Sequence, residues 1–224
     1  MHQRNESDQT IRTKKTNVAR RKEAQQKRSH KKVESILSVT LEMLGEGPTE
    51  RIGTKSIAKA AGVSVGSLYR FFPNKEAIYY ELYRRWLAQN LDALDRLIER
   101  LEKDATLEQF TDAFLDVMTE PELNSPGNWR LRLAMGTSRK LAELEASHRM
   151  EVVHRVAILQ SQFGKLPSPE VASDVLILQN EVTIACLFSL AQATNTPSEA
   201  LIRRLCKTLF LLIFDYDHWR QEAN

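Results

Sequence analysis

The side chains best suited to chemistry lie together, close to residue 64. Short hydroxyls at a helix N-terminus bring backbone N–H groups near phosphate, a tyrosine hydroxyl donates to phosphate, and an arginine matches a guanine edge or a phosphate. All three types occur in one short segment, whose outward-facing positions are predicted to be Ser64, Val65, Ser67, Tyr69 and Arg70. This combination indicates contact with a nucleic-acid duplex.

Two short helices joined by a tight turn must position these side chains. The first begins at Thr54 with a hydroxyl cap and ends at Gly62, which can supply the positive φ of a sharp turn. Ser64 can cap the second, which runs to about Phe71 and is stopped by Pro73. Apolar residues are spaced to pack the two helices together. The pattern predicts a helix-turn-helix, whose second helix fits the major groove of DNA, about 12 Å wide.

Gly66 and Tyr69 each allow two interpretations. A glycine inside a helix sacrifices about 1 kcal/mol relative to alanine, which is tolerable if the backbone must come near DNA. The alternative for Gly66 is a surface glycine of no consequence. For Tyr69 the alternative is a partly buried ring, which is compatible with DNA contact because only the hydroxyl need be exposed.

The rest of the chain shows helical periodicity and no strand pattern, so the predicted fold class is all-α. Gly and Pro clusters separate the helices, with a loop over 121–127 and a break expected near 136–138. The last two segments are apolar nearly all round, so they must be covered on several sides. The cover is either a second copy of the chain or the same domain. Helices are predicted over 29–44, 75–103, from Thr106 onward, 129–163, 168–193 and 197–221.

Charge is distributed unevenly. Residues 1–32 hold eleven basic and three acidic residues, a net charge of +8, while the remainder holds 21 basic and 26 acidic residues, a net charge of −5. A basic end on a mildly acidic body indicates a polyanionic partner, either nucleic acid or an anionic membrane. The alternative is a solvated tail that keeps the protein soluble.

Several classes of protein are excluded or disfavoured. Cys186 and Cys206 are too few for a disulfide scaffold, which favours a reducing compartment. The N-terminus has no apolar core for a secretory signal, and the longest apolar run is far below the ~20 residues of a membrane span, so we expect a cytoplasmic protein that does not enter the membrane. His148, Glu151 and His154 fit no metal motif. No catalytic residue, metal ligand or cofactor is predicted, so an enzyme is disfavoured.

Residues 52–78, IGTKSIAKAAGVSVGSLYRFFPNKEAI, resemble the DNA-binding segment of the tetracycline-repressor (TetR) family of bacterial transcription regulators. The likeness is strong over about 29–85 and includes the IA..AGVS core, the LYRFF element and the PNKEA helix start. The resemblance implies an all-helical homodimer in which three small N-terminal helices read DNA. It also implies a larger C-terminal domain that dimerises through its last two long helices and often encloses a small-molecule pocket.

The family motif implies roles for individual residues. It places Thr54 at the start of a helix as a phosphate contact, and Ser64, Gly66 and Ser67 at the groove. Tyr69 and Lys75 fall where backbone phosphates are clamped. Arg70 occupies a position that varies across the family, so a base contact and a phosphate contact both stay open for it.

These observations predict three parts: a basic, flexible arm over 1–28, a helix-turn-helix domain over 29–76, and a helical dimerisation and ligand-binding domain over 77–224. The predicted function is a regulator, most simply a repressor, that binds an inverted-repeat operator in double-stranded DNA as a homodimer and is released by a small-molecule effector. The alternative is a ligand-independent or non-specific DNA-binding protein. Trp129, Gln179 and Thr183 are polar or amphipathic residues among apolar neighbours, expected either to line the ligand pocket or to be ordinary core or interface residues.

Overall fold

The computed structural model describes residues 4–47, 51–101, 104–120, 125–135, 139–163, 177–178, 181–186 and 199–214. Within these ranges every regular element is a helix, as the sequence predicts, and no strand occurs. The labelled helices are α1 (Arg4–Glu46), α2 (Thr54–Ala60), α3 (Val65–Phe71), α4 (Lys75–Arg100), α5 (Leu107–Met118), α6 (Pro126–Met135), α7 (Arg139–Phe163) and α9 (Glu199–Phe214).

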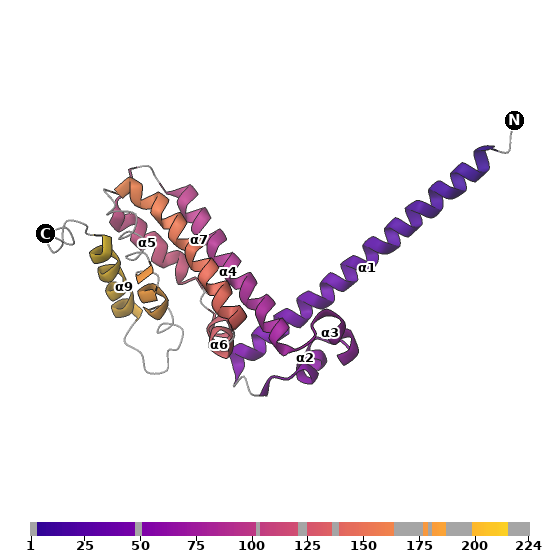
Figure 1. Ribbon diagram of the computed structural model, residues 1–224, viewed down its shortest axis with the longest axis horizontal. Helices are drawn as coiled ribbons and strands as arrows, with labels where there is room; N and C mark the ends of the chain where they lie inside the picture. The colour runs from indigo at the N-terminus through magenta and orange to yellow at the C-terminus, as the bar shows by residue number, and fades with distance from the viewer. Residues whose placement is uncertain are drawn as a thin grey trace.

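The C-terminal part of α1 forms a small head with α2 and α3 (Figure 1). Ile36 of α1, Ile57 of α2 and Leu68 of α3 are fully buried against one another in its core. The Ser35 hydroxyl donates to the carbonyl of Ala61 at 3.1 Å, which fixes α1 to the end of α2. The head therefore holds α3 firmly while leaving its other side uncovered.

The helix α1 is much longer than predicted. It begins at Arg4 rather than at Ser29, so the segment expected as a flexible arm continues the helix and projects away from the body (Figure 1). The physical reason lies in the sequence, because no Gly or Pro occurs before Gly45 and good helix formers such as Arg, Lys, Gln and Ala are frequent. An exposed ion pair between Glu23 and Lys27, one turn apart, adds a little support.

The helix α4 connects the head to the body. One hydrophobic core runs from Ile78 in the head through Trp86 to Trp129 and Leu141 in the body, so the two parts share a packed interior. Arg85 anchors α4 to α1, with its Nη1 2.8 Å from the Glu34 carboxylate. The hydrogen bond from Arg85 lowers the pKa of Glu34 despite the opposing effect of burial.

The helices α5, α6 and α7 complete the described body beside α4 (Figure 1). The helix predicted from Thr106 onward is confirmed, and Thr106 caps it: its hydroxyl accepts from the Gln109 N–H while the Gln109 side chain accepts from the Thr106 N–H. The predicted break near 136–138 lies outside the described residues, between the end of α6 at Met135 and the start of α7 at Arg139. The expected loop over 121–127 ends earlier than predicted, because Pro126 begins α6 at a position where its missing N–H costs nothing.

Only parts of the last two predicted helices are described. Residues 177–178 and 181–186 are helical, and the rest of the predicted helix over 168–193 lies outside the described residues. The helix α9 occupies 199–214 of the segment predicted as 197–221, and its Arg203 and Lys207 make ion pairs with Asp116 and with two acidic residues of α5. None of the described helices combines the length and apolar character needed to cross a bilayer.

Candidate nucleic-acid interface

Ser64 and Gly62 set the start and direction of α3. The Ser64 hydroxyl accepts a hydrogen bond from the Ser67 N–H at 3.1 Å and so caps the helix. Gly62 has a φ of +65°, as the sequence predicts for a tight turn. Val63 N–H then donates to Ala58 carbonyl at 3.0 Å, which folds α3 back across α2. These local features produce the predicted helix-turn-helix.

The outward side of α3 carries the residues predicted to contact DNA. Val65 and Tyr69 are 37% and 49% exposed, although large apolar and aromatic side chains usually pack inside. Gly66 and Arg70 are exposed beside them, while Ser67 is half-buried. The helix α3 therefore has one exposed side that could enter a DNA groove, while its opposite side, at Leu68, is fully buried.

Thr54 and Tyr69 lie side by side, although they are fifteen residues apart in the sequence. The Thr54 hydroxyl oxygen is 3.0 Å from the Tyr69 hydroxyl oxygen, so the two share a hydrogen bond on the exposed surface. The family motif implied a phosphate contact for each of them separately. Their hydrogen bond joins the start of α2 to the middle of α3 in one polar cluster.

Two predicted cationic contacts are held against aromatic rings. The Lys75 ammonium lies 5.4 Å from the centre of the Tyr79 ring, and the Arg70 guanidinium carbon lies 5.0 Å from the centre of the Phe71 ring. Lys75 begins α4, which Asn74 caps by accepting from the Ala77 N–H at 2.8 Å. Both cations are thereby positioned at the C-terminal end of α3 with limited rotational freedom.

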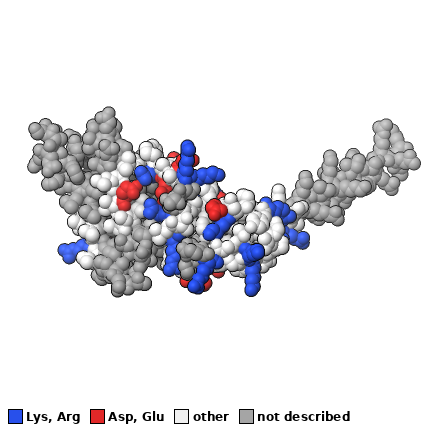
Figure 2. Space-filling model, turned by 60° about the horizontal axis from the view of Figure 1, so that its bottom comes forward, with Lys and Arg blue, Asp and Glu red and all other residues white. Residues whose placement is uncertain are grey.

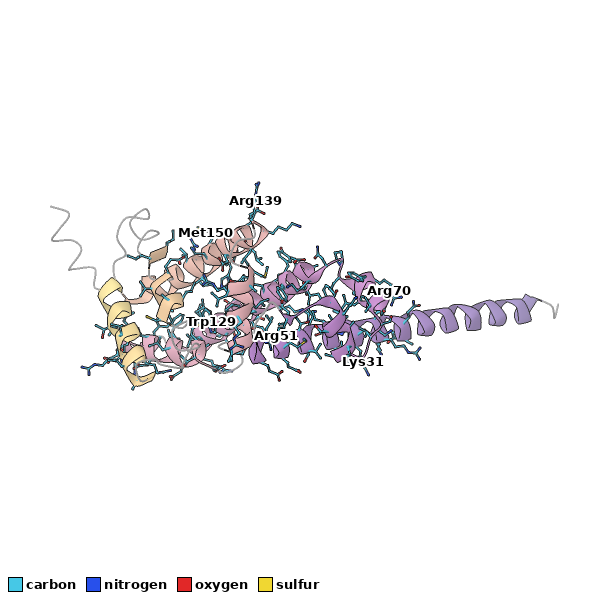
Figure 3. The ribbon with its side chains drawn as sticks, turned by 90° about the horizontal axis from the view of Figure 1, so that it is seen from below. Lys31, Arg51, Arg70, Trp129, Arg139 and Met150 are labelled. Atoms are coloured by element: carbon cyan, nitrogen blue, oxygen red, sulfur yellow. The ribbon has the colours of Figure 1, made fainter. Side chains whose placement is uncertain are left out.

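Further exposed basic residues of the head are not among the predicted DNA contacts. Arg51, Lys55 and Lys59 precede or lie on α2, and Lys31 lies on α1; Figure 3 shows Arg51, Lys31 and Arg70 on the elements of the head. Figure 2 shows Lys and Arg side chains projecting around the base of α1. The spacing of Lys55 and Lys59, one turn apart and away from the buried Ile57, would have placed both on an exposed side of α2.

Comparison with known proteins gives one consistent result. The sequence model of the family described as bacterial regulatory proteins, tetR family, matches residues 36–82. These residues form the end of α1, the helix-turn-helix and the start of α4. Over these residues the chain is similar to the TetR family. The match ends within α4, so the likeness of the family model is concentrated in the head.

Other known proteins are similar to this chain over a longer stretch than the head. The chain is 24% identical over 135 residues to the fatty acid metabolism regulator protein of Bacillus subtilis (strain 168), a match of 60% of this chain and 57% of that relative. The chain therefore spans little more than half the length of this relative. It is 28% identical over 163 residues to the HTH-type transcriptional regulator EthR of Mycobacterium tuberculosis (strain H37Rv, also numbered ATCC 25618), covering 69% and 74% of the two chains. The crystal structure of a TetR-family transcriptional regulator from Streptomyces coelicolor shares the fold, with a TM-score of 0.57, 19% identity and coverage of 81% and 99%.

A cavity of about 100 Å³ lies in the body of the chain. Trp129 and Thr183, two of the three predicted ligand-binding residues, both line it, together with Trp86 and Phe114. The third, Gln179, lies outside the described residues. Figure 3 shows Trp129 among the helices of the body, whereas Arg139 and Met150 project from α7.

The polar residues around the cavity are mostly bonded to one another. The Tyr83 hydroxyl donates to Glu145 Oε1 at 2.5 Å, and the Arg132 Nε donates to the same oxygen at 3.0 Å. Burial and the Glu145 carboxylate raise the pKa of Tyr83, which keeps its hydroxyl protonated as a donor. Arg149 pairs with Glu181 across the cavity at 3.0 Å.

The three residues rejected as a metal motif are separated by the structure. His148 lines the cavity, Glu151 pairs with Arg155 at 2.7 Å, and His154 is exposed on α7. In the part of the chain that the structure describes, no three or more His, Cys, Asp and Glu side chains are grouped so that they could hold a metal ion.

The last helices expose large apolar side chains. Leu201 and Leu205 of α9 are 56% and 52% exposed, and Leu178 is 55% exposed. Leu201 and Leu205 are one turn apart, while Arg203 and Lys207 point the other way and pair with α5. The helix α9 thus has one side attached to the body and a leucine side that is exposed among the described residues.

Proposed function

We propose that this chain is a sequence-specific DNA-binding transcriptional regulator that works as a homodimer. The observation that carries the proposal is the exposed side of α3, where Val65, Tyr69 and Arg70 stand out from a fully buried Leu68. A helix presented in this way can place its side chains against base edges in the major groove. The names of the relatives, which include an HTH-type transcriptional regulator, support the same function.

The proposed division of labour follows the helices. Residues 29–76 bind DNA, residues 77–224 dimerise and hold a ligand, and residues 1–28 add a basic segment that favours the polyanion. In this scheme Thr54, Tyr69 and Lys75 contact phosphates, while Ser64, Val65, Gly66, Ser67 and Arg70 face the groove. The two-fold symmetry of a dimer requires an operator with inverted half-sites.

We further propose that the chain is a repressor which a small molecule releases through the cavity lined by Trp129 and Thr183. The cavity lies between α4, which leads directly into the head, and α6 and α7. A ligand that changes the position of α4 would alter the spacing of the two heads. The coupling is limited by the difference in ligand affinity between the two arrangements.

The proposal is tested by recovering genomic fragments that the purified protein retains and challenging the tightest with random competitor DNA. We expect retention of an inverted-repeat fragment at a large excess of competitor. Equal competition by random DNA would contradict sequence specificity and favour the alternative of a non-specific DNA-binding protein. Tyr69→Ala combined with Lys75→Ala should weaken binding to all DNA sequences alike. The variant should also make the affinity for DNA less dependent on salt concentration, because phosphate contacts release counterions.

A further inference from the structure

The cavity is small, and aromatic side chains of α4, α5 and α6 form part of its walls. The Trp86 and Trp129 rings meet edge to face at 5.2 Å between centres, and Tyr83 meets Trp86 in the same way at 5.5 Å. Phe114, Leu94 and other apolar side chains complete the lining. Its volume of about 100 Å³ is below that of most drug-sized pockets and near that of an apolar cavity which admits benzene. The walls therefore suit a single flat ring.

The charged side chains of the cavity leave no obvious partner for a charged ligand. Glu145 is already bonded to Arg132 and Tyr83. Arg149 and Glu181 neutralise each other in the same way. An ion that entered the cavity would have to break one of these pairs or remain buried without a counter-charge, and both are unfavourable in an apolar site.

His148 differs from the other polar residues of the cavity. It lines the cavity, yet its Nδ1 is buried and has no hydrogen-bond partner within the described part of the chain. Burial, followed by the nearby Arg155, lowers the pKa of His148 to about 4, against the opposing effect of Glu145 and Glu151. The imidazole is therefore neutral at neutral pH, and Nδ1 lacks a bond that such a buried atom normally makes.

We propose that the effector of this cavity is an uncharged molecule with a single ring and one hydrogen-bonding group that bonds to Nδ1 of His148. This inference rests on the proposed function, since it names the ligand class of the effector site. The ring packs against Trp86 and Trp129, and the polar group supplies the bond that Nδ1 lacks. Because Nδ1 is buried, the ligand widens the cavity on the His148 side as it binds.

Four probes of nearly equal size differ in charge and in hydrogen-bonding group: benzyl alcohol, toluene, benzoate and benzylamine. Their affinities are measured for the full chain at pH 7.5 by tryptophan fluorescence, to which Trp86 and Trp129 of the cavity contribute together with Trp219. We expect benzyl alcohol to bind about tenfold more tightly than toluene, because a net hydrogen bond is worth roughly that factor. It should also bind at least about tenfold more tightly than benzoate and benzylamine, which are charged at this pH.

The role of His148 is tested with a matched pair of variants on α7. His148→Leu should reduce the affinity for benzyl alcohol about tenfold, to the level of toluene, and leave toluene unchanged or slightly tighter. His154→Leu removes an exposed histidine from the same helix and should change neither affinity. Circular dichroism and unfolding curves of both variants verify that the fold is retained.

Three results would overturn the ligand class: benzoate or benzylamine binding as tightly as benzyl alcohol, no binding of benzyl alcohol up to its solubility limit, or an unchanged preference in His148→Leu. The effector role is measured separately as release of retained genomic DNA by benzyl alcohol. If benzyl alcohol binds through His148 but releases no DNA, the ligand class stands and the proposed release mechanism fails. If the chain retains no DNA, the regulator function fails while the fluorescence titration still decides the ligand class.

Discussion

Gly66 is exposed on α3, and a Cβ added there would meet no atom within 4 Å. The folded chain alone gives no reason for glycine at this position, where alanine would stabilise the helix by about 1 kcal/mol. A close approach of the α3 backbone to DNA would provide one. The two roles of Gly66 can therefore be separated by experiment.

We expect Gly66→Ala to raise the free energy of unfolding slightly and to weaken operator binding about tenfold or more, because the added methyl group meets the duplex. Urea unfolding and gel-shift titration measure the two effects. Gly53→Ala is the control, since that position is also open but lies outside α3. Unchanged operator affinity in Gly66→Ala would show that the backbone of α3 does not approach the bases.

His148 also affects stability. The pKa of His148 is about 4 in the folded chain and ordinarily about 6.5. Between these values the unfolded chain binds a proton that the folded chain resists, so the folded state loses stability as the pH falls from 6.5 towards 4. Above pH 6.5 both states are neutral at this residue and the effect vanishes.

We expect His148→Gln to flatten this part of the stability profile, with a difference from the parent chain of up to about 3 kcal/mol at pH 4 and a constant difference above pH 7. Urea unfolding at a series of pH values measures it. His154→Gln, on the exposed side of α7, should leave the profile close to that of the parent. A parallel loss of stability in the parent and His148→Gln would contradict the assignment.

Among the helices, α6 has an unusual contact with α1. Arg130 Nη1 donates to the carbonyls of Leu44 and Gly45 at 3.1 and 2.7 Å, so α6 supplies donors for the C-terminal end of α1. Beside it, Gly127 is buried so tightly that an added Cβ would lie 2.6 Å from the carbonyl oxygen of Leu41. The same helix carries Trp129 and Arg132 in the wall of the cavity.

We expect Gly127→Ala to destabilise the chain by about 1–3 kcal/mol, because the obstructing atom belongs to the backbone and α6 must separate from α1. Unfolding in urea measures the loss. Gly47→Ala, where the added carbon meets nothing within 4 Å, is the matched control. If Gly127→Ala were as stable as the parent, the close packing of α6 on α1 would be wrong.

The helices that the sequence predicted well are those with a local start and stop. Ser64 caps α3 and Gly62 makes the expected turn, because these effects involve only neighbouring residues. The start of α1 was mispredicted because its first half has no apolar periodicity, although it also has no breaker. The hydrogen bond between Thr54 and Tyr69 depends on packing between distant segments, which periodicity does not encode. The same holds for the burial of His148 Nδ1 without a partner among the described residues.

At the scale of the whole molecule, assembly is the property that α9 should control. Leu201 and Leu205 expose apolar area that a dimer through the last two helices would bury, because a symmetric interface pairs the same surface of both copies. We expect Leu201→Glu combined with Leu205→Glu to convert the dimer into monomers and to weaken operator binding, because two heads then no longer bind together.

Sedimentation measures the assembly, and circular dichroism verifies the helices of the monomer. The control is Met150→Glu, which introduces the same charge at an apolar residue of α7 that is 55% exposed and projects from that helix (Figure 3). A double variant that still sediments as a dimer would exclude this side of α9 from the interface.

The contact at Gly127 has one more mechanical consequence. At Gly127 the main chain of α6 lies directly against the main chain of α1, so at this contact α6 has no side chain that could rotate to absorb a small displacement. A displacement of α6 must therefore either move α1, whose C-terminal part belongs to the head, or open a gap beside Leu41. The link between the cavity wall and the head therefore has little room for intermediate positions.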